Sequence, residues 1–325
     1  GLLGILCAVS ASGSDILRKL PQPNPRAIAV ADHVLANQFT FQGVTGSPGQ
    51  SETGQFDWQH GGPKKDREWA WFLNRHRYFE DLYLAHQATG DERYLEKLFQ
   101  LLDDWLQQHA QAPNHINFSS AWRPLEAARR ILESWDLVYC KLWQHPLFSK
   151  ELKNRFLATL DQHGPYLQRH HALFGNHLIT EMLALLKLAV LRSAHPQSAE
   201  WKAYALEQLE KQYQQQFYPA GVHKELSAHY QRVVLLNYQL LINFLKADND
   251  TNGLQRWQAR VDEMWAYLAA IQKPNGYAPI NNDADRENIR QLSRQHVGQA
   301  LSREAKNHYF KQSGQVIFAQ DSGPH

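Results

Sequence analysis

The chain of 325 residues has little cysteine and little net charge, and each scarcity excludes a class of protein. Cys7 and Cys140 are its two cysteines, which excludes a scaffold of several disulfides and any metal site built from several thiolates. The formal net charge is only +2, so bulk electrostatics do not favour nucleic acid as a partner. An anionic ligand would have to be bound by cations gathered at one place.

Apolar and aromatic residues are plentiful instead. Hydrophobic residues make up 43% of the sequence and aromatic residues 11%, which excludes a disordered chain. At this length the chain can form one large domain or two smaller ones. Residues 1–9 are apolar and too short to span a membrane. Two interpretations of residues 1–30 stay open, a signal-peptide remnant without its basic front end or a fragment of a buried helix.

From about residue 65 onward, apolar residues recur with the period of an α-helix. Residues 182–191 are apolar nearly all round, which predicts a helix enclosed by others. Three long stripes predict buried helix faces: Tyr94, Leu95, Leu98, Leu101, Leu102, Trp105 and Leu106; Phe156, Leu157, Leu160 and Leu167; Leu226, Val233, Val234, Leu241 and Leu245. Roughly ten helices joined by short turns predict an all-α domain of successive helical hairpins. Residues 315–319 differ and predict a short strand, the start of a β-rich domain that the chain cuts off.

Two segments carry groups that suit proton transfer at carbon. Asn176 and His177 follow Gly175 at the start of a predicted helix, where a plain N-cap is the structural alternative for the asparagine. We expect Glu225, His229 and Tyr230 to lie within one and a half turns of a second helix. Here the alternatives are a surface pair between the first two residues and a core tyrosine.

Cations alternate with aromatic residues in two further segments, residues 64–79 and 122–130. One interpretation is a helix with a solvated face. The other is a sugar platform, in which aromatic rings stack on pyranose rings and guanidinium groups bind carboxylates or sulfates. Arg75, Trp122 and Arg123 are the candidates for substrate binding in these segments.

In this order, the segments resemble a known family, the N-terminal helical domain of the heparinase III lyases (polysaccharide lyase family 12), within the wider heparinase II/III and alginate lyase group. The resemblance runs from about Ala31 to the end of the chain. It rests on five blocks: WFLNR (71–75) with YF (78–79), ATGDE (88–92), WRPLE (122–126), GNH (175–177) with Glu181, and FYPAG (217–221) leading to Glu225 and Tyr230.

The resemblance implies an incomplete (α/α) toroid of about five helical hairpins at residues 31–305, followed at residues 306–325 by the first strand of a truncated β-sandwich. It also implies roles: Asn176 neutralises the uronate carboxylate, Tyr230 serves as base, acid or both, and His177 assists. We assign substrate binding to Arg75, Trp122, Arg123, Glu225 and His229. The family also uses a histidine of its β-sandwich, so we expect this fragment to be inactive alone.

The expected reaction is β-elimination on a uronate polysaccharide, without metal or other cofactor. Hydrogen bonds from an amide to the uronate carboxylate stabilise the charge that develops when the C5 proton leaves. Heparan sulfate, alginate and a bacterial exopolysaccharide all stay open as substrates, in a periplasmic or secreted setting. We expect no nucleic-acid partner and no membrane span, and the oligomeric state stays open.

Two other classes stay open. A glycoside hydrolase on a helical toroid would use paired carboxylates. Glu126, Asp283 and Asp285 are the carboxylates that could serve, although a turn or a helix cap explains the two aspartates better. The third class is a domain that binds a glycan without catalysis.

Overall fold

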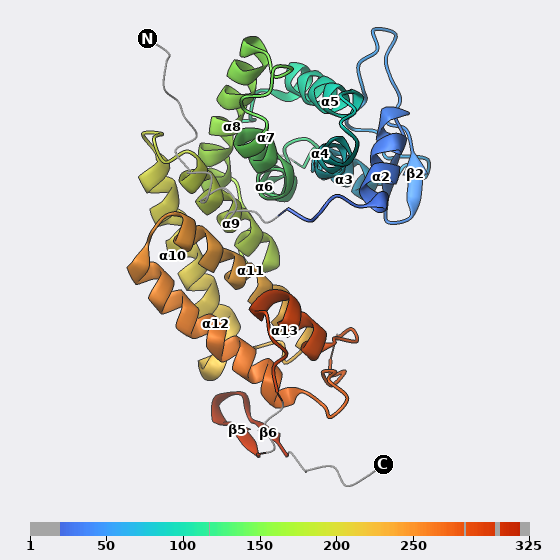
Figure 1. Ribbon diagram of the computed structural model, residues 1–325. Helices are drawn as coiled ribbons and strands as arrows, with labels where there is room; N and C mark the ends of the chain where they lie inside the picture. Colours follow the sequence, from blue (N-terminus) through green and yellow to red (C-terminus); the bar gives the residue numbers. More distant parts are fainter. Residues whose placement is uncertain (1–19, 117, 283, 303–305, 319–325) are drawn as a thin grey trace. The chain divides into compact units, whose positions relative to one another are not determined.

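The computed structural model describes residues 20–116, 118–282, 284–302 and 306–318 (Figure 1). The chain divides into two compact units, residues 1–207 and 208–325, and each is described by itself. Three subjects of the sequence analysis lie outside the described residues: the apolar stretch 1–9 with Cys7, the carboxylate Asp283, and residues 319–325.

Helices dominate the first unit. Its elements in chain order are α2 (Pro25–Leu35), β1 (Phe39–Phe41), β2 (Val44–Gly46), α3 (Arg67–Asn74), α4 (Tyr78–Thr89), α5 (Arg93–His109), α6 (Pro124–Arg130), the π-helical turn η1 (Ile131–Trp135), α7 (Asp136–Lys141), α8 (Lys150–Arg169) and α9 (Gly175–Leu191). β1 and β2 pair as antiparallel strands, α2 packs on α4, and α9 packs on α6 and α8. The expected boundary at residue 31 falls inside α2.

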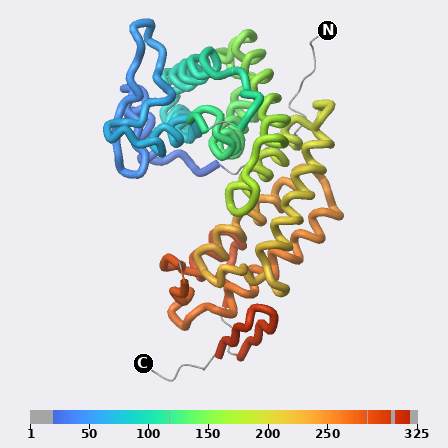
Figure 2. Tube along the Cα trace, turned by 180° about the vertical axis from the view of Figure 1, so that it is seen from behind, coloured from blue at the N-terminus to red at the C-terminus, as the bar shows by residue number. Residues whose placement is uncertain are grey.

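The second unit begins within α10 (Ser198–Gln216), which starts in the first unit. The elements that follow are β3 (Phe217–Tyr218), the 3-10 turn η2 (Pro219–Gly221), β4 (Val222–His223), α11 (Ala228–Ala247), α12 (Thr251–Ile271), α13 (Ile289–Val297), β5 (His308–Phe310), the 3-10 turn η3 (Lys311–Ser313) and β6 (Gln315–Ile317). α11 and α12 lie side by side as a helical hairpin, seen from two sides in Figures 1 and 2. Across the described ranges, no helix has both the length and the apolar composition needed to cross a bilayer.

The helical pattern of the sequence is largely confirmed. All seven residues of the first predicted stripe are buried in α5. In α9, every side chain from residue 178 to residue 191 is buried, so this helix is enclosed as predicted. Lys187 is the buried cation of α9, and its ammonium group lies 2.5 Å from Asp136 Oδ2 and 3.0 Å from the carbonyl oxygen of Leu132. The enclosed helix therefore carries an ion pair that satisfies its one buried cation.

The helix expected between residues 221 and 230 begins later than predicted. Ala220 and Gly221 take left-handed conformations, with φ of 66° and 68°, and close a hairpin between β3 and β4. Ser227 then caps α11, and Ala228 is the first helical residue. Glu225 and Leu226 thus precede the helix. The predicted i, i+4 pair between Glu225 and His229 is therefore wrong, and so is the prediction that Leu226 lies on the buried face of this helix.

The strand predicted near the C-terminus is confirmed in part. β6 begins directly after Gly314 and pairs antiparallel with β5, with Tyr309 opposite Val316. The strand ends at Ile317, two residues before the predicted end. The β-sandwich that this hairpin was expected to open stays a prediction.

A buried guanidinium group occupies the centre of the first unit. Arg130, on α6, is fully buried, and its side chain donates to the carbonyl oxygens of Asn74 at 2.9 Å and Ala121 at 3.0 Å. The guanidinium carbon lies 4.3 Å from the ring centre of Trp105 and 5.2 Å from that of Trp135. Burial lowers the pKa of Arg130 to about 9, which leaves the side chain charged at neutral pH.

These contacts connect α6 to two chain segments that carry candidate site residues. Asn74 directly precedes Arg75, and Ala121 precedes Trp122 and Arg123. The hydroxyl of Ser134 strengthens the connection, because it donates to the carbonyl oxygen of Arg75 at 2.9 Å. The positions of the guanidinium groups of Arg75 and Arg123 therefore depend on the guanidinium group of Arg130, which no ligand can reach.

Replacing the buried arginine should cost much more stability than replacing its neighbour. In Arg130→Met, two buried carbonyl groups lose their charged donor, and we expect a loss of about 3 kcal/mol or more in the free energy of unfolding. Arg129→Met is the matched control, because that side chain is 38% exposed and pairs with Glu133 at 2.9 Å, and a loss below about 1 kcal/mol is expected. Denaturant unfolding of both variants measures the difference, and equal losses would contradict this account.

Candidate functional site

The N-terminus of α9 presents Asn176 and His177. Phe174 is the N-cap residue and has no side-chain oxygen that could serve as a cap. Gly175 has a φ of 81° and turns the chain into the helix. Asn176 therefore lies in the first turn and not at the N-cap, so the capping interpretation of this asparagine is wrong. The helix is 17 residues long, and the partial positive charge of its N-terminus favours an anion near these side chains.

A cationic pair lies at the C-terminal end of α3 and the N-terminal end of α6, where Arg75 and Arg123 are the cap residues, and the two helices pack against each other. Arg75 donates to Glu126 Oε1 at 2.8 Å, and Arg123 donates to Glu126 Oε2 at 2.8 Å. The guanidinium carbon of Arg75 lies 4.2 Å from the ring centre of Phe72, and that of Arg123 lies 3.9 Å from the ring centre of Trp71. Two guanidinium groups share one buried carboxylate, so one positive charge is left over in what we call the Arg75–Arg123 pair.

His177 lies within the electrostatic influence of this pair. The side chain of His177 is exposed but loses part of its hydration, which lowers its pKa, and the positive charge of Arg123 lowers the pKa further, against the opposing charge of Glu126. The packing of α6 on α9 brings these groups together, although they are about fifty residues or more apart in the chain. His177 is therefore neutral at neutral pH and can accept a proton or donate a hydrogen bond.

A buried carboxyl group supports the loop in front of α9. Glu181 is 2% exposed, and its Oε2 accepts a hydrogen bond of 2.7 Å from the backbone N–H of Ala172. Burial raises the pKa of Glu181 from its ordinary value of 4.5 to about 7, against the effects of this hydrogen bond and of Arg123. Glu181 was recognised in the sequence only as part of a family block. Through its hydrogen bond with Ala172, Glu181 holds the loop that leads into the first turn of α9, where Asn176 lies.

In the second unit, Tyr230 lies in the first turn of α11 and is half-buried, so it is not a core tyrosine. Its backbone N–H donates to the hydroxyl of the N-cap residue Ser227. The next residue, Gln231, is fully buried, donates to the carbonyl oxygen of Gly221 and accepts from the N–H of His223, both at 2.8 Å. Gln231 thus fixes the β3–β4 hairpin against the helical turn that carries Tyr230, a role that its sequence context did not indicate.

His229 is part of a charged network beside Tyr230. Its Nδ1 lies 3.0 Å from Glu287 Oε1, and the same oxygen accepts a hydrogen bond of 2.7 Å from Arg232. The rings of His229 and Tyr230 lie edge to face with their centres 5.3 Å apart. Glu225 is exposed in the preceding loop, where its carbonyl oxygen accepts from the side chain of Asn282 at 2.9 Å. The network and the loop place His229, Tyr230 and Glu225 in one region of the second unit.

The sugar-platform interpretation is wrong for most of the aromatic residues to which it was applied. Trp122 is 3% exposed, and its indole N–H donates to the carbonyl oxygen of His109 at 2.9 Å, so its ring cannot stack on a substrate. Trp69, Tyr78 and Phe79 are likewise buried in the core. Trp71 is partly exposed, and it supports Arg123 from below.

Two of the three carboxylates of the hydrolase alternative, Glu126 and Asp285, lie among the described residues, and they belong to different units. Glu126 is fully buried, and both of its oxygens accept hydrogen bonds from guanidinium groups. It therefore links two arginines and is not placed as a catalyst. Asp285 lies 3.4 Å from His229 Nδ1 and is 84% exposed.

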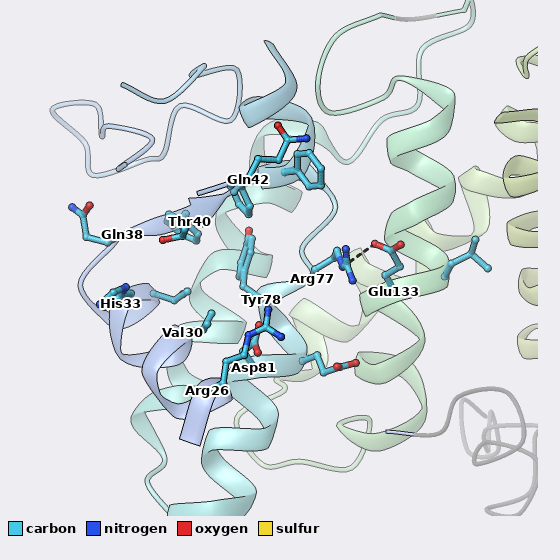
Figure 3. A pocket seen from close by; sticks show the side chains of 16 residues that line it. Arg26, Val30, His33, Gln38, Thr40, Gln42, Arg77, Tyr78, Asp81 and Glu133 are labelled. Carbon is cyan, nitrogen blue, oxygen red and sulfur yellow. Dashed lines mark ion pairs between the residues drawn. The ribbon is translucent and has the colours of Figure 1, made fainter. Parts of the chain in front are cut away.

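A pocket of about 500 Å³ opens in the first unit among α2, β1, α4 and η1 (Figure 3). Its lining includes Arg77, which pairs with Glu133 at 3.3 Å, and Asp81, whose pKa is raised to about 6 by burial. None of the candidate site residues lines this pocket. Phe72 connects the two regions, because it lies at the edge of the pocket and its ring also contacts Arg75.

The structure thus gathers Arg75, Arg123, Asn176 and His177 in one unit, and Tyr230 with its neighbours in the other. The expectation that Asn176 and Tyr230 face one groove stays a prediction, because the two residues belong to different units.

Comparison with solved structures confirms the expected fold class, the incomplete (α/α) toroid of heparinase N-terminal domains. The heparan sulfate lyase HepC from Pedobacter heparinus aligns with a TM-score of 0.74 at 23% identity, over 89% of this chain and 46% of that chain. Heparinase III aligns with a TM-score of 0.71 at 18% identity, over 95% of this chain and 49% of that chain.

The chain belongs to the heparinase II/III family, since the family description "Heparinase II/III N-terminus" matches residues 23–311. The heparin-sulfate lyase of Pedobacter heparinus is 27% identical over 258 residues, 78% of this chain and 38% of that protein. The heparin-sulfate lyase of Bacteroides stercoris is 24% identical over 281 residues, 81% of this chain and 42% of that protein. The chain thus spans less than half the length of these curated relatives.

The buried carboxyl group predicts a specific pH dependence of stability. Because the pKa of Glu181 is about 7 in the folded chain and 4.5 ordinarily, the folded state retains a proton that the unfolded state releases between these pH values. Stability from this group therefore falls as the pH rises through that range. In Glu181→Gln the side chain stays neutral and its amide oxygen can still accept from Ala172. We expect the variant to gain up to about 3 kcal/mol at pH 8 and almost nothing at pH 4. Denaturant unfolding at both pH values measures this, and a gain independent of pH would contradict it.

Proposed function

We propose that the protein is a polysaccharide lyase that cleaves a uronate-containing glycan of the heparan sulfate type by β-elimination. The observation that carries the proposal is the Arg75–Arg123 pair beside the N-terminus of α9, where Asn176 and His177 lie. Membership of the heparinase II/III family and the relatives named heparin-sulfate lyase support it. An enzyme would encounter such a polysaccharide outside the cytoplasm, which fits the expected periplasmic or secreted location.

The first step is binding of the polyanion. The guanidinium groups of Arg75 and Arg123 are held against aromatic rings and against Glu126, so they lose little freedom when they bind a carboxylate or a sulfate. The N-terminus of α9 adds favourable potential for the same charge. Glu225 and His229 are proposed to contact the sugar units next to Tyr230. Trp122 has no direct part, because its ring is buried.

The second step is removal of the proton at C5 of the uronate. The amide of Asn176 donates a hydrogen bond to the substrate carboxylate, which stabilises the extra charge that develops as the C5–H bond breaks. The phenolate of Tyr230 takes the proton. The electron pair of the C5–H bond forms the C4=C5 double bond, the bond from C4 to the linking oxygen breaks, and that oxygen takes up the proton from Tyr230. The product is an unsaturated uronate.

The tyrosine needs positive charge nearby to act as a base. A phenol has an ordinary pKa of about 10, so it must be lowered for the phenolate to be populated near neutrality. His177 does not supply this charge, because partial desolvation and the charge of Arg123 lower its pKa and leave it neutral. In this proposal guanidinium groups close to the bound uronate supply it, and neutral His177 donates a hydrogen bond to the substrate.

Two substitutions in the full-length protein test the reaction. Tyr230→Phe and Asn176→Ala should each lower turnover of heparan sulfate at least about 100-fold, because they remove the base and an oxyanion-type donor. The measurement is the near-ultraviolet absorbance of the new double bond. Tyr309→Phe is the matched control, since this tyrosine is 66% exposed on β5, and its turnover should be normal.

Other outcomes of the same assay contradict the proposal. Normal turnover by Tyr230→Phe would remove the tyrosine from the mechanism. New reducing ends without the absorbance would indicate a hydrolase, and binding without either signal would indicate a non-catalytic glycan-binding protein.

The anion site can be tested on this chain itself. Arg75→Gln and Arg123→Gln should each weaken the binding of heparan sulfate oligosaccharides by roughly tenfold, because each removes a charged, pre-oriented donor. Arg294→Gln is the control, since it changes the net charge equally from an exposed position on α13. Calorimetric titration at two salt concentrations measures the affinities. Equal weakening by all three variants would show that binding follows net charge and not the Arg75–Arg123 pair.

A further inference from the structure

Three side chains with metal-binding atoms converge in the first unit, on segments that carry none of the proposed catalytic residues. His86 lies in the last turn of α4, Glu92 is the N-cap residue of α5, and His145 lies in the turn between α7 and α8. One potential ligand atom from each lies within 4.8 Å of the others. We propose that these residues bind a zinc ion that connects the α4–α5 turn to the α7–α8 turn.

One pair of ligand atoms is already spaced nearly as a zinc ion requires, and all three lie within 4.8 Å of one another. His145 Nε2 lies 3.7 Å from Glu92 Oε2. Two ligands of a tetrahedral zinc ion with bonds of 2.0–2.2 Å are separated by roughly 3.3–3.6 Å. The two imidazole rings are nearly perpendicular, with their centres 6.2 Å apart, so their edges can converge on one point without stacking. Small side-chain movements are enough to close the site.

Both histidines are oriented by contacts outside the cluster. His86 Nδ1 lies 3.3 Å from the carbonyl oxygen of Asp91, so this nitrogen carries the proton and Nε2 presents its lone pair. The ring of His145 stacks on that of Phe99, with centres 6.0 Å apart. Its Nδ1 lies 3.3 Å from the backbone N–H of Leu147. To bind zinc through Nε2, His145 must carry its proton on Nδ1, and the hydrogen bond from Leu147 is then lost. This loss is small compared with the gain from a zinc–nitrogen bond.

The third ligand, Glu92, lies on the solvent-exposed side of the proposed site. The side chain of Glu92 is 56% exposed, whereas that of His145 is 19% exposed. A metal ion can therefore enter from solvent, with the flexible carboxylate closing over it and water taking the fourth position. Two imidazoles and one carboxylate favour zinc over calcium or magnesium, which prefer sites made of oxygen ligands only.

The site is structural in this proposal. α5 packs against both α4 and α8, so an ion held between their connecting turns restrains helices that already touch. It stabilises the folded state through its binding to that state alone. The lyase proposal does not depend on it, so each can fail without the other.

Titration of the chain with zinc chloride tests the inference. We expect one zinc equivalent to be lost, or its affinity to fall at least about tenfold, in His86→Gln and in His145→Gln. Zinc should raise the Tm of the native chain by several degrees and should not do so in these two variants.

His115→Gln is the matched control, because this histidine is exposed on a loop elsewhere in the first unit. It should bind zinc as the native chain does. An unchanged zinc stoichiometry and affinity in both His86→Gln and His145→Gln would overturn the proposal. So would a rise in Tm with magnesium or calcium chloride equal to that with zinc chloride.

Discussion

The buried guanidinium group of Arg130 is the interaction on which the candidate site depends most. It hydrogen-bonds the carbonyl groups of Asn74 and Ala121 inside a cage of tryptophan rings, and the chain segments that follow these residues carry Arg75 and Arg123. A charge buried at this depth needs hydrogen-bond acceptors, so the backbone that carries these two carbonyl groups has little freedom. The buried guanidinium group of Arg130 therefore orients those of Arg75 and Arg123, which a ligand can reach.

Much of the fold could be predicted because helical periodicity is a local property. The stripe that became α5 and the continuous apolar run that became α9 were both visible in the sequence. The start of α11 was not, because it depends on left-handed conformations at Ala220 and Gly221, and alanine gives no signal of such a turn. The division into two compact units was also invisible, since α10 runs across it without a break.

For the candidate site, the sequence predicted which residue types take part better than it predicted whether each side chain is buried or exposed. Alternating cations and aromatic residues identified Arg75 and Arg123, yet the same pattern suggested that Trp122 was a sugar platform, and its ring is in the core. Burial is decided by partners far away in sequence, so a local pattern cannot distinguish an exposed ring from an enclosed one. Glu126 and Gln231 were missed as structural links for the same reason, because their roles come from bonds to distant or irregular backbone and side chains.

The burial of residues 178–191 of α9 has a consequence for how this protein can change over evolutionary time. A substitution along residues 178–191 would disturb close packing on every side, so most would be removed by selection for folding alone. The loop ahead of the helix is under no such restriction, since Leu173 and Phe174 are 84% and 75% exposed. Sequence change should therefore accumulate in that loop, while the helix behind it stays the same.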